Sequence, residues 1–119
     1  MGKSKKNLGD YGENLAAHFL KAKGYEIIDN HFCLRGGEID LIAQNENELV
    51  FVEVKTRLNT NFGYASDCVP PYKIKKLMYS AEKYLSQKQL KPENYRIDVV
   101  GIDYDHGKLE IEHIVDALI

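Results

Sequence analysis

The segment of residues 49–57, which reads LVFVEVKTR, constrains the fold of this chain more than any other. Side chains alternate between the two faces of a β-strand, so its odd-numbered residues share one face and its even-numbered residues the other. The first half is apolar on both faces, which predicts a central strand covered on both sides. The second half carries Glu53 and Lys55 on one face, and burying such charges is costly unless they are compensated. These two side chains therefore either form an ion pair or surround a metal ion and a water molecule.

Composition places the chain among ordinary globular proteins. Its 119 residues suit one domain, and 44% hydrophobic with 29% charged residues exclude a disordered chain. No apolar run approaches the ~20 residues needed to span a bilayer, and the basic N-terminus leads into no apolar signal core. We therefore expect a cytoplasmic protein without a membrane partner.

Net charge and cysteine usage restrict the function only weakly. The formal net charge of −2 argues against a strong nonspecific nucleic-acid binder, although lysines gather at residues 3–6 and 73–76. Cys33 and Cys68 form no CxxC motif, and their spacing to the four histidines predicts no zinc site. We interpret both cysteines as free thiols in a reducing compartment.

The hydrophobic pattern predicts one α/β domain in which helices flank a central mixed β-sheet, in the order α-β-β-β-α-β-β. Residues 1–8 are predicted to be a basic flexible arm and residues 9–119 the domain. The first helix is expected over residues 9–23, and two prolines at residues 70–71 open the second. Strands are expected over residues 25–32, 38–44, 49–57, 95–102 and 109–115, the last at a sheet edge. The polar loop between the central strand and the second helix is either a substrate-ordered gate or a variable connection.

Asp40 supplies a second carboxylate. The polar residues 45–48 should close a hairpin into the central strand, and adjacent strands lie ~4.8 Å apart, so a matching register would bring Asp40 close to Glu53. Strict alternation would put Glu38, Asp40 and Ile42 on one face of their strand, and Ile39, Leu41 and Ala43 on the other.

Asp40, Glu53 and Lys55 permit a specific chemistry. Two neighbouring carboxylates repel each other unless one is protonated or a cation lies between them. Hard oxygen ligands suit Mg²⁺ or Mn²⁺, and Lys55 could orient the attacking water, take its proton or hold a phosphate oxygen. Together these groups indicate metal-dependent phosphodiester hydrolysis. The alternative is a Glu53–Lys55 ion pair with Asp40 capping a turn, and for Asp98 a structural role is favoured.

At these residues the chain resembles a known group of enzymes. The runs GEIDLI at residues 37–42 and VEVKTR at residues 52–57 resemble the PD-(D/E)xK nuclease superfamily. The resemblance is closer to the YraN family of small endonuclease-like proteins, which is similar in fold to the archaeal Holliday junction resolvases. GDYGENLA at residues 9–16 and YRIDVV at residues 95–100 are similar to that family's first-helix and late-strand motifs. One departure is Ile39, which stands where the superfamily name has proline.

The resemblance implies a restriction-endonuclease-like core and assigns roles to residues. Asp40, Glu53 and the backbone carbonyl of Val54 would hold Mg²⁺ or Mn²⁺, and Lys55 would be the catalytic lysine. Glu13 would reach in from the first helix, where periodicity alone predicts a solvated rim position. The DNA contacts would come from Arg57, Lys73 and Lys76.

Two functions follow as hypotheses. The first is a metal-dependent DNA endonuclease, selective for branched or otherwise structured DNA, with a homodimer as a possible assembly and no small-molecule cofactor. The second is a noncatalytic module on the same fold that binds nucleic acid or a protein partner, which the acidic charge balance favours.

Overall fold

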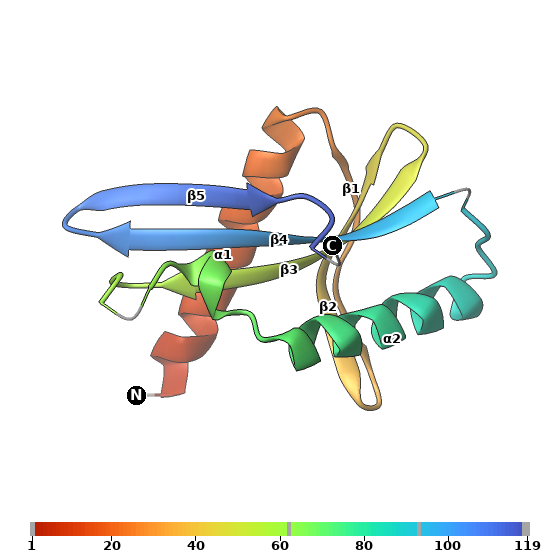
Figure 1. The fold of residues 1–119 in the computed structure, drawn as a ribbon, viewed down its shortest axis with the longest axis horizontal. Coiled ribbons are helices and arrows are strands. Elements are labelled where there is room, and N and C mark those ends of the chain that lie inside the picture. Colours follow the sequence, from red (N-terminus) through yellow and green to blue (C-terminus); the bar gives the residue numbers. More distant parts are fainter. Residues whose placement is uncertain (1, 62, 93, 118–119) are drawn as a thin grey trace.

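The computed structural model describes residues 2–61, 63–92 and 94–117, with side chains from residue 8 onward. It has the predicted element order, with one short 3₁₀-helix added in the loop before the second helix (Figure 1). The elements are α1 (Gly2–Ala22), β1 (Glu26–Leu34), β2 (Gly37–Asn45), β3 (Glu48–Arg57), η1 (Ala65–Cys68), α2 (Pro71–Gln87), β4 (Asn94–Asp105) and β5 (Lys108–Ile114). The predicted α/β class is confirmed, and the architecture is consistent with a restriction-endonuclease-like core.

The five strands form one mixed sheet in the order β1-β2-β3-β4-β5. Neighbouring strands are antiparallel except β3 and β4, which run parallel. A parallel pair needs a crossover connection, and here η1 and α2 provide it. The strand 49–57 is thus the middle strand of the sheet and the last strand lies at an edge, as predicted.

Two hydrophobic clusters cover the two faces of β3. On one face, Ala16 and Leu20 of α1 pack with Val50 and Val52 of β3. On the other face, Leu77, Ala81 and Tyr84 of α2 pack with Phe51 and Ile97. In the view of Figure 1, α1 passes behind the strands and α2 lies in front of the β1–β2 hairpin. Because both faces of β3 are buried, the first half of this strand has apolar side chains on both faces.

Helix α1 begins earlier than predicted. The sequence pattern predicts a start near Gly9, but the helix begins at Gly2. No proline interrupts these residues, lysine is a good helix former, and an isolated glycine inside a helix costs only ~1 kcal/mol. The flexibility of residues 1–8 remains a prediction.

Gly12 lets α1 approach the sheet closely. A Cβ atom at this position would collide with the hydroxyl of Thr56 on β3. Because only glycine lacks this atom, the backbone of α1 can lie directly against the last part of β3. The following residue, Glu13, is thereby held beside the sheet.

The predicted alternation of β2 is wrong at Ile39. Leu41 and Ala43 pack on the α1 face, but Ile39 packs on the α2 face together with Ile42. The pairing of β1 with β2 shifts register between Ile27 and Asp29, and His31 of β1 has a left-handed φ of 49°. Such irregularities break the two-residue period of a strand.

The loop between β3 and α2 is tied to the sheet. Thr60 donates from its hydroxyl to Asp105 Oδ2 at 2.6 Å, and Ala65 N–H donates to Asp103 Oδ1 at 2.9 Å. Ser66 hydrogen-bonds to Glu112 of β5. The two roles considered for this loop, a substrate-ordered gate and a variable connection, stay predictions.

Candidate functional site

Asp40 and Glu53 lie where β2 and β3 separate. The hydrogen-bonded ladder between these strands ends at the pair Leu41–Val52, and Asp40 and Glu53 are the first residues beyond it. Asp40 Oδ2 then accepts a hydrogen bond of 2.8 Å from the backbone N–H of Val54, so a side chain replaces the missing backbone partner. Both carboxylates are nearly buried, each residue being 8% exposed.

Burial and mutual repulsion shift both acids toward the protonated form. Burial raises the pKa of Glu53 to about 7, and the charge of Asp40 adds to the rise. The pKa of Asp40 is also raised, mainly by burial and partly by Glu38, against the hydrogen bond from Val54. The structure therefore holds two interacting acids whose charges lack full compensation from the protein.

Two lysines face Glu53. Lys73 of α2 places its Nζ 3.8 Å from Glu53 Oε2, and its charge lowers the pKa of Glu53 against the effect of burial. Lys55 makes a weaker contribution in the same direction. Among the described residues no Glu53–Lys55 ion pair forms within 4.0 Å, so the partner considered in the sequence analysis is replaced by Lys73.

Glu13 and His31 approach the pair from the side of α1. Burial and the charge of Asp40 raise the pKa of Glu13, whereas the neighbouring His31 lowers it. His31 Nδ1 lies 3.6 Å from Glu13 Oε1. His31 is a functional candidate that the sequence does not indicate, because nothing in a strand pattern marks it. The signal is its left-handed backbone, which only the structure shows.

The carbonyl of Val54 faces the same gap as Asp40. In an extended strand the N–H and C=O of one residue point toward the same neighbouring strand. Val54 donates its N–H to Asp40, so its C=O also points toward the β2 side, beyond the end of the ladder. The position suits the backbone ligand that the resemblance implies.

One cleft opens beside Glu53 and another beside Glu13. One of about 460 Å³ lies between the β1–β2 hairpin and α2, and Glu38, Glu53, Lys73 and Lys76 line it. The other, of about 660 Å³, lies between α1 and β1 and is lined by Glu13 and His31 among others. Glu53 is therefore reachable from solvent although it is nearly buried, whereas Asp40 is not among the residues that line either cleft.

Arg57 differs from the other proposed DNA contacts. Its Nη2 donates to Cys68 Sγ at 2.7 Å, and its Nε is buried without a hydrogen-bond partner among the described residues. The side chain is thus engaged inside the protein, whereas Lys73 and Lys76 line the cleft beside Glu53.

Asp98 belongs to a separate structural network. It is fully buried and accepts hydrogen bonds from Arg96 Nε at 3.0 Å, His113 Nε2 at 2.7 Å and the N–H of Asp116 at 3.0 Å. Burial alone would raise the pKa of Asp98, but the hydrogen bonds from His113, Arg96 and Asp116 lower it below its ordinary value. The structural role favoured for Asp98 agrees with these contacts.

The raised pKa of Glu53 predicts a pH dependence of stability. A carboxyl group that binds its proton more tightly in the folded state stabilises the fold at low pH, and this stability is lost as pH rises from about 4.5 to about 7. The free energy of unfolding of the metal-free protein should therefore fall over this range. Glu53→Gln should remove much of the fall and stabilise the protein at pH 8 by roughly 1–3 kcal/mol.

Urea unfolding at pH 5 and pH 8, in the presence of a chelator, measures this effect. The matched control is Glu82→Gln, an exposed acid on α2, which should leave the pH profile unchanged. A Glu53→Gln variant that is less stable than the parent at pH 8 would contradict the prediction.

The fold and these acids together define a class: a small α/β domain, consistent with a restriction-endonuclease-like core, that carries a carboxylate cluster at the opening of its sheet. Within the described residues, no helix combines the length and the apolar character needed to cross a bilayer.

The chain belongs to the protein family UPF0102 (YraN), described as an uncharacterised protein family, whose profile matches residues 12–102. It is 40% identical over 117 residues to a UPF0102 protein of Caldanaerobacter subterraneus, covering 96% of both chains. It is 44% identical over 113 residues to one of Geotalea daltonii, covering 94% of this chain and 89% of that one. The resemblance to the YraN family is thereby confirmed.

Proposed function

We propose that this protein is a Mg²⁺- or Mn²⁺-dependent DNA endonuclease of the PD-(D/E)xK superfamily, acting in the cytoplasm. The observation that carries the proposal is the meeting of Asp40 and Glu53 at the opening between β2 and β3. Two lysines and the carbonyl side of Val54 accompany them, which is the set of groups that phosphodiester hydrolysis needs.

The residues present fit a hard divalent cation. Asp40, Glu53 and the Val54 carbonyl offer only oxygen ligands, which Mg²⁺ and Mn²⁺ prefer. The pKa of Glu53, raised to about 7 by burial and by Asp40, indicates a site that favours added positive charge. A bound ion would supply an activated water at neutral pH and would offset negative charge on the phosphate.

The side chains around the acids have distinct proposed roles. Lys55 would hold and orient the attacking water or accept its proton. Lys73, which pairs with Glu53 at 3.8 Å, would exchange this partner for a phosphate oxygen when DNA binds. Glu13 would contribute a further carboxylate from α1, kept beside Asp40 by the close approach at Gly12.

The substrate class follows from the shape and charge of the surroundings. Lys73 and Lys76 line the cleft beside Glu53, where they can contact the phosphate backbone, whereas Arg57 is engaged with Cys68 and would have to turn outward. The net charge of −2 argues against strong nonspecific binding to duplex DNA. We therefore propose branched or otherwise structured DNA as the substrate, with a homodimer as an assembly to be tested.

The experiment is a cleavage assay on end-labelled duplex, flapped, four-way-junction and single-stranded DNA. We expect at least one substrate to be cut with Mg²⁺ or Mn²⁺ and none with a chelator. A mock preparation from cells that lack the protein is the control against a contaminating nuclease. No cutting of any substrate with either ion would contradict the proposal.

A second function is favoured by one observation. The Glu53–Lys73 ion pair partly compensates the charge of Glu53 without a metal ion. A noncatalytic module that binds nucleic acid or a protein partner would use the fold with this ion pair intact and without a metal ion. It predicts salt-sensitive DNA binding that Glu53→Gln leaves unchanged, together with no uptake of Mg²⁺ or Mn²⁺ by calorimetry.

A further inference from the structure

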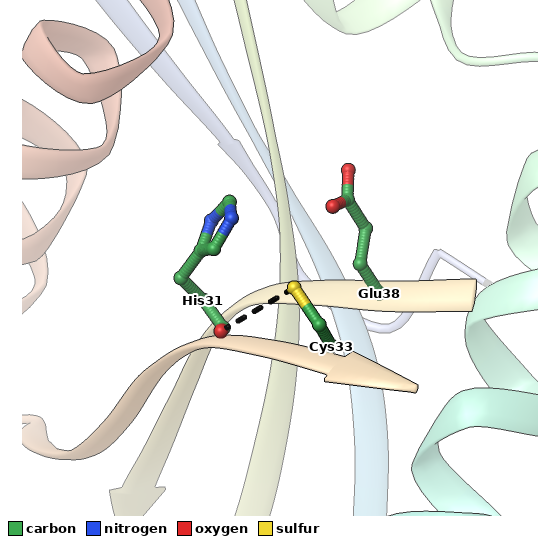
Figure 2. Close-up of side chains that lie close together, drawn as sticks. All are labelled: His31, Cys33 and Glu38. Atoms are coloured by element: carbon green, nitrogen blue, oxygen red, sulfur yellow. Dashed lines mark hydrogen bonds between the residues drawn. The ribbon is translucent and has the colours of Figure 1, made fainter. Parts of the chain in front are cut away.

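A second cluster of ligand atoms lies on the β1–β2 hairpin, beside the acids already described: its Cys33 and Glu38 line the same cleft as Glu53. His31 and Cys33 of β1 and Glu38 of β2 each offer one ligand atom, and these atoms all lie within 4.8 Å of one another. In Figure 2 the imidazole, the thiol and the carboxylate rise from the same side of the hairpin. We propose that this cluster binds a Zn²⁺-type divalent cation.

The backbone of the hairpin brings these donors together. Cys33 and Glu38 are directly paired across the two strands, and His31 precedes Cys33 by two residues. The next pair, Leu34–Gly37, closes the hairpin. Side chains of directly paired residues have Cβ atoms about 4.5–5.5 Å apart, so strand pairing rather than one chosen rotamer sets their proximity.

The distances are close to those of a zinc site. Zn²⁺ binds sulfur at about 2.3 Å and nitrogen or oxygen at about 2.0–2.2 Å, so two ligand atoms of a tetrahedral ion lie roughly 3.4–3.6 Å apart. The cluster, whose ligand atoms lie within 4.8 Å of one another, would have to close to this separation when an ion binds. All three residues are exposed, and the side chain of His31 is 57% exposed, so the donors can rotate and an ion can enter from solvent.

The donor types determine which ion binds. Thiolate and imidazole suit Zn²⁺, whereas Mg²⁺ prefers oxygen ligands. Three protein ligands leave a fourth tetrahedral position for water. The hairpin site therefore selects Zn²⁺ even in an excess of Mg²⁺.

This inference does not depend on the nuclease proposal, but the two sites are neighbours. His31 also lies 3.6 Å from Glu13, so an ion on the hairpin would draw the imidazole away from that acid. Cysteine and histidine spacing alone predicts no zinc site in this sequence. Glu38 joins the cluster through strand pairing, which linear spacing does not show.

Co²⁺ titration tests the proposal, because Co²⁺ adopts the tetrahedral geometry of zinc and absorbs in the near ultraviolet when a thiolate binds it. In excess Mg²⁺, one equivalent of Co²⁺ should produce this band, and Zn²⁺ should abolish it by displacement. Cys33→Ser should remove the band, and His31→Gln or Glu38→Gln should weaken binding at least about tenfold. Circular dichroism checks that each variant is folded.

Two variants serve as matched controls. Cys68→Ser, which removes the other thiol, should keep the band, and so should Glu53→Gln, which alters the proposed Mg²⁺ site. The proposal is overturned by an absent band in the parent protein, by a band that persists in Cys33→Ser, or by a band lost in either control. None of these outcomes depends on whether the protein cleaves DNA.

Discussion

On the nuclease proposal, replacing Lys55 with alanine should lower the rate of metal-dependent DNA cleavage by about 10²–10⁴-fold, which is the usual contribution of a group that transfers or positions a proton. Lys55 lies two residues after Glu53 on the central strand, and its charge favours the ionised form of that acid. It makes no ion pair within 4.0 Å in the part of the chain that the structure describes, so its removal should leave the fold intact.

Single-turnover cleavage at saturating protein measures this effect, and calorimetry with Mn²⁺ separates it from metal binding. Lys55→Ala should keep most of its metal affinity, whereas Glu53→Gln should lose both cleavage and affinity. Lys75→Ala is the matched control, because this lysine is exposed on α2 and is not among the residues that line the cleft beside Glu53. If Lys55→Ala and Glu53→Gln cut DNA as fast as the parent protein, the measured activity belongs to a contaminant or another site.

Replacing Asp98 with alanine should destabilise the fold by about 3–5 kcal/mol, since it removes one partner of a buried ion pair. The fully buried carboxylate accepts hydrogen bonds from Arg96 and His113. The side chains of these partners are only 10% and 3% exposed, so they would lose the carboxylate where water cannot readily replace it. Arg96 would retain its pair with Glu48, at 2.6 Å, and its bond to Tyr25, which limits the loss.

Urea unfolding of Asp98→Ala at pH 7, monitored by far-ultraviolet circular dichroism, measures this loss. Asp67→Ala is the control, because Asp67 is exposed on η1 and its removal should change stability by less than about 0.5 kcal/mol. Equal stability of the two variants would show that the Asp98 network contributes little to the fold.

Periodicity predicted the architecture well because the core imposes it locally. Three features can each be recognised from neighbouring residues alone, without knowledge of distant segments. They are the apolar residues on both faces of β3, the polar hairpin residues 45–48 and the amphipathic pattern of α2. The approach of Asp40 to Glu53 also followed from one short hairpin, and the structure pairs the neighbouring residues Leu41 and Val52.

The features that the sequence did not reveal depend on irregular backbone or on distant segments. The position of Ile39 changes because strand alternation breaks near Asp40, where His31 has a left-handed backbone. The partner of Glu53 is Lys73, which depends on how α2 lies across the sheet. The network of Asp98 joins residues of β4 to His113 on β5, and residue patterns within one strand carry no information on such pairing.

The separation of β2 and β3 after Leu41–Val52 has a consequence for biosynthesis. Glu13 approaches this opening from the helix on one face, and Lys73 approaches it from the helix on the other. A nascent or partly melted chain, in which either layer has not yet docked, would lack one of these groups. On the nuclease proposal, hydrolytic capability would therefore require both helical layers to be docked on the sheet.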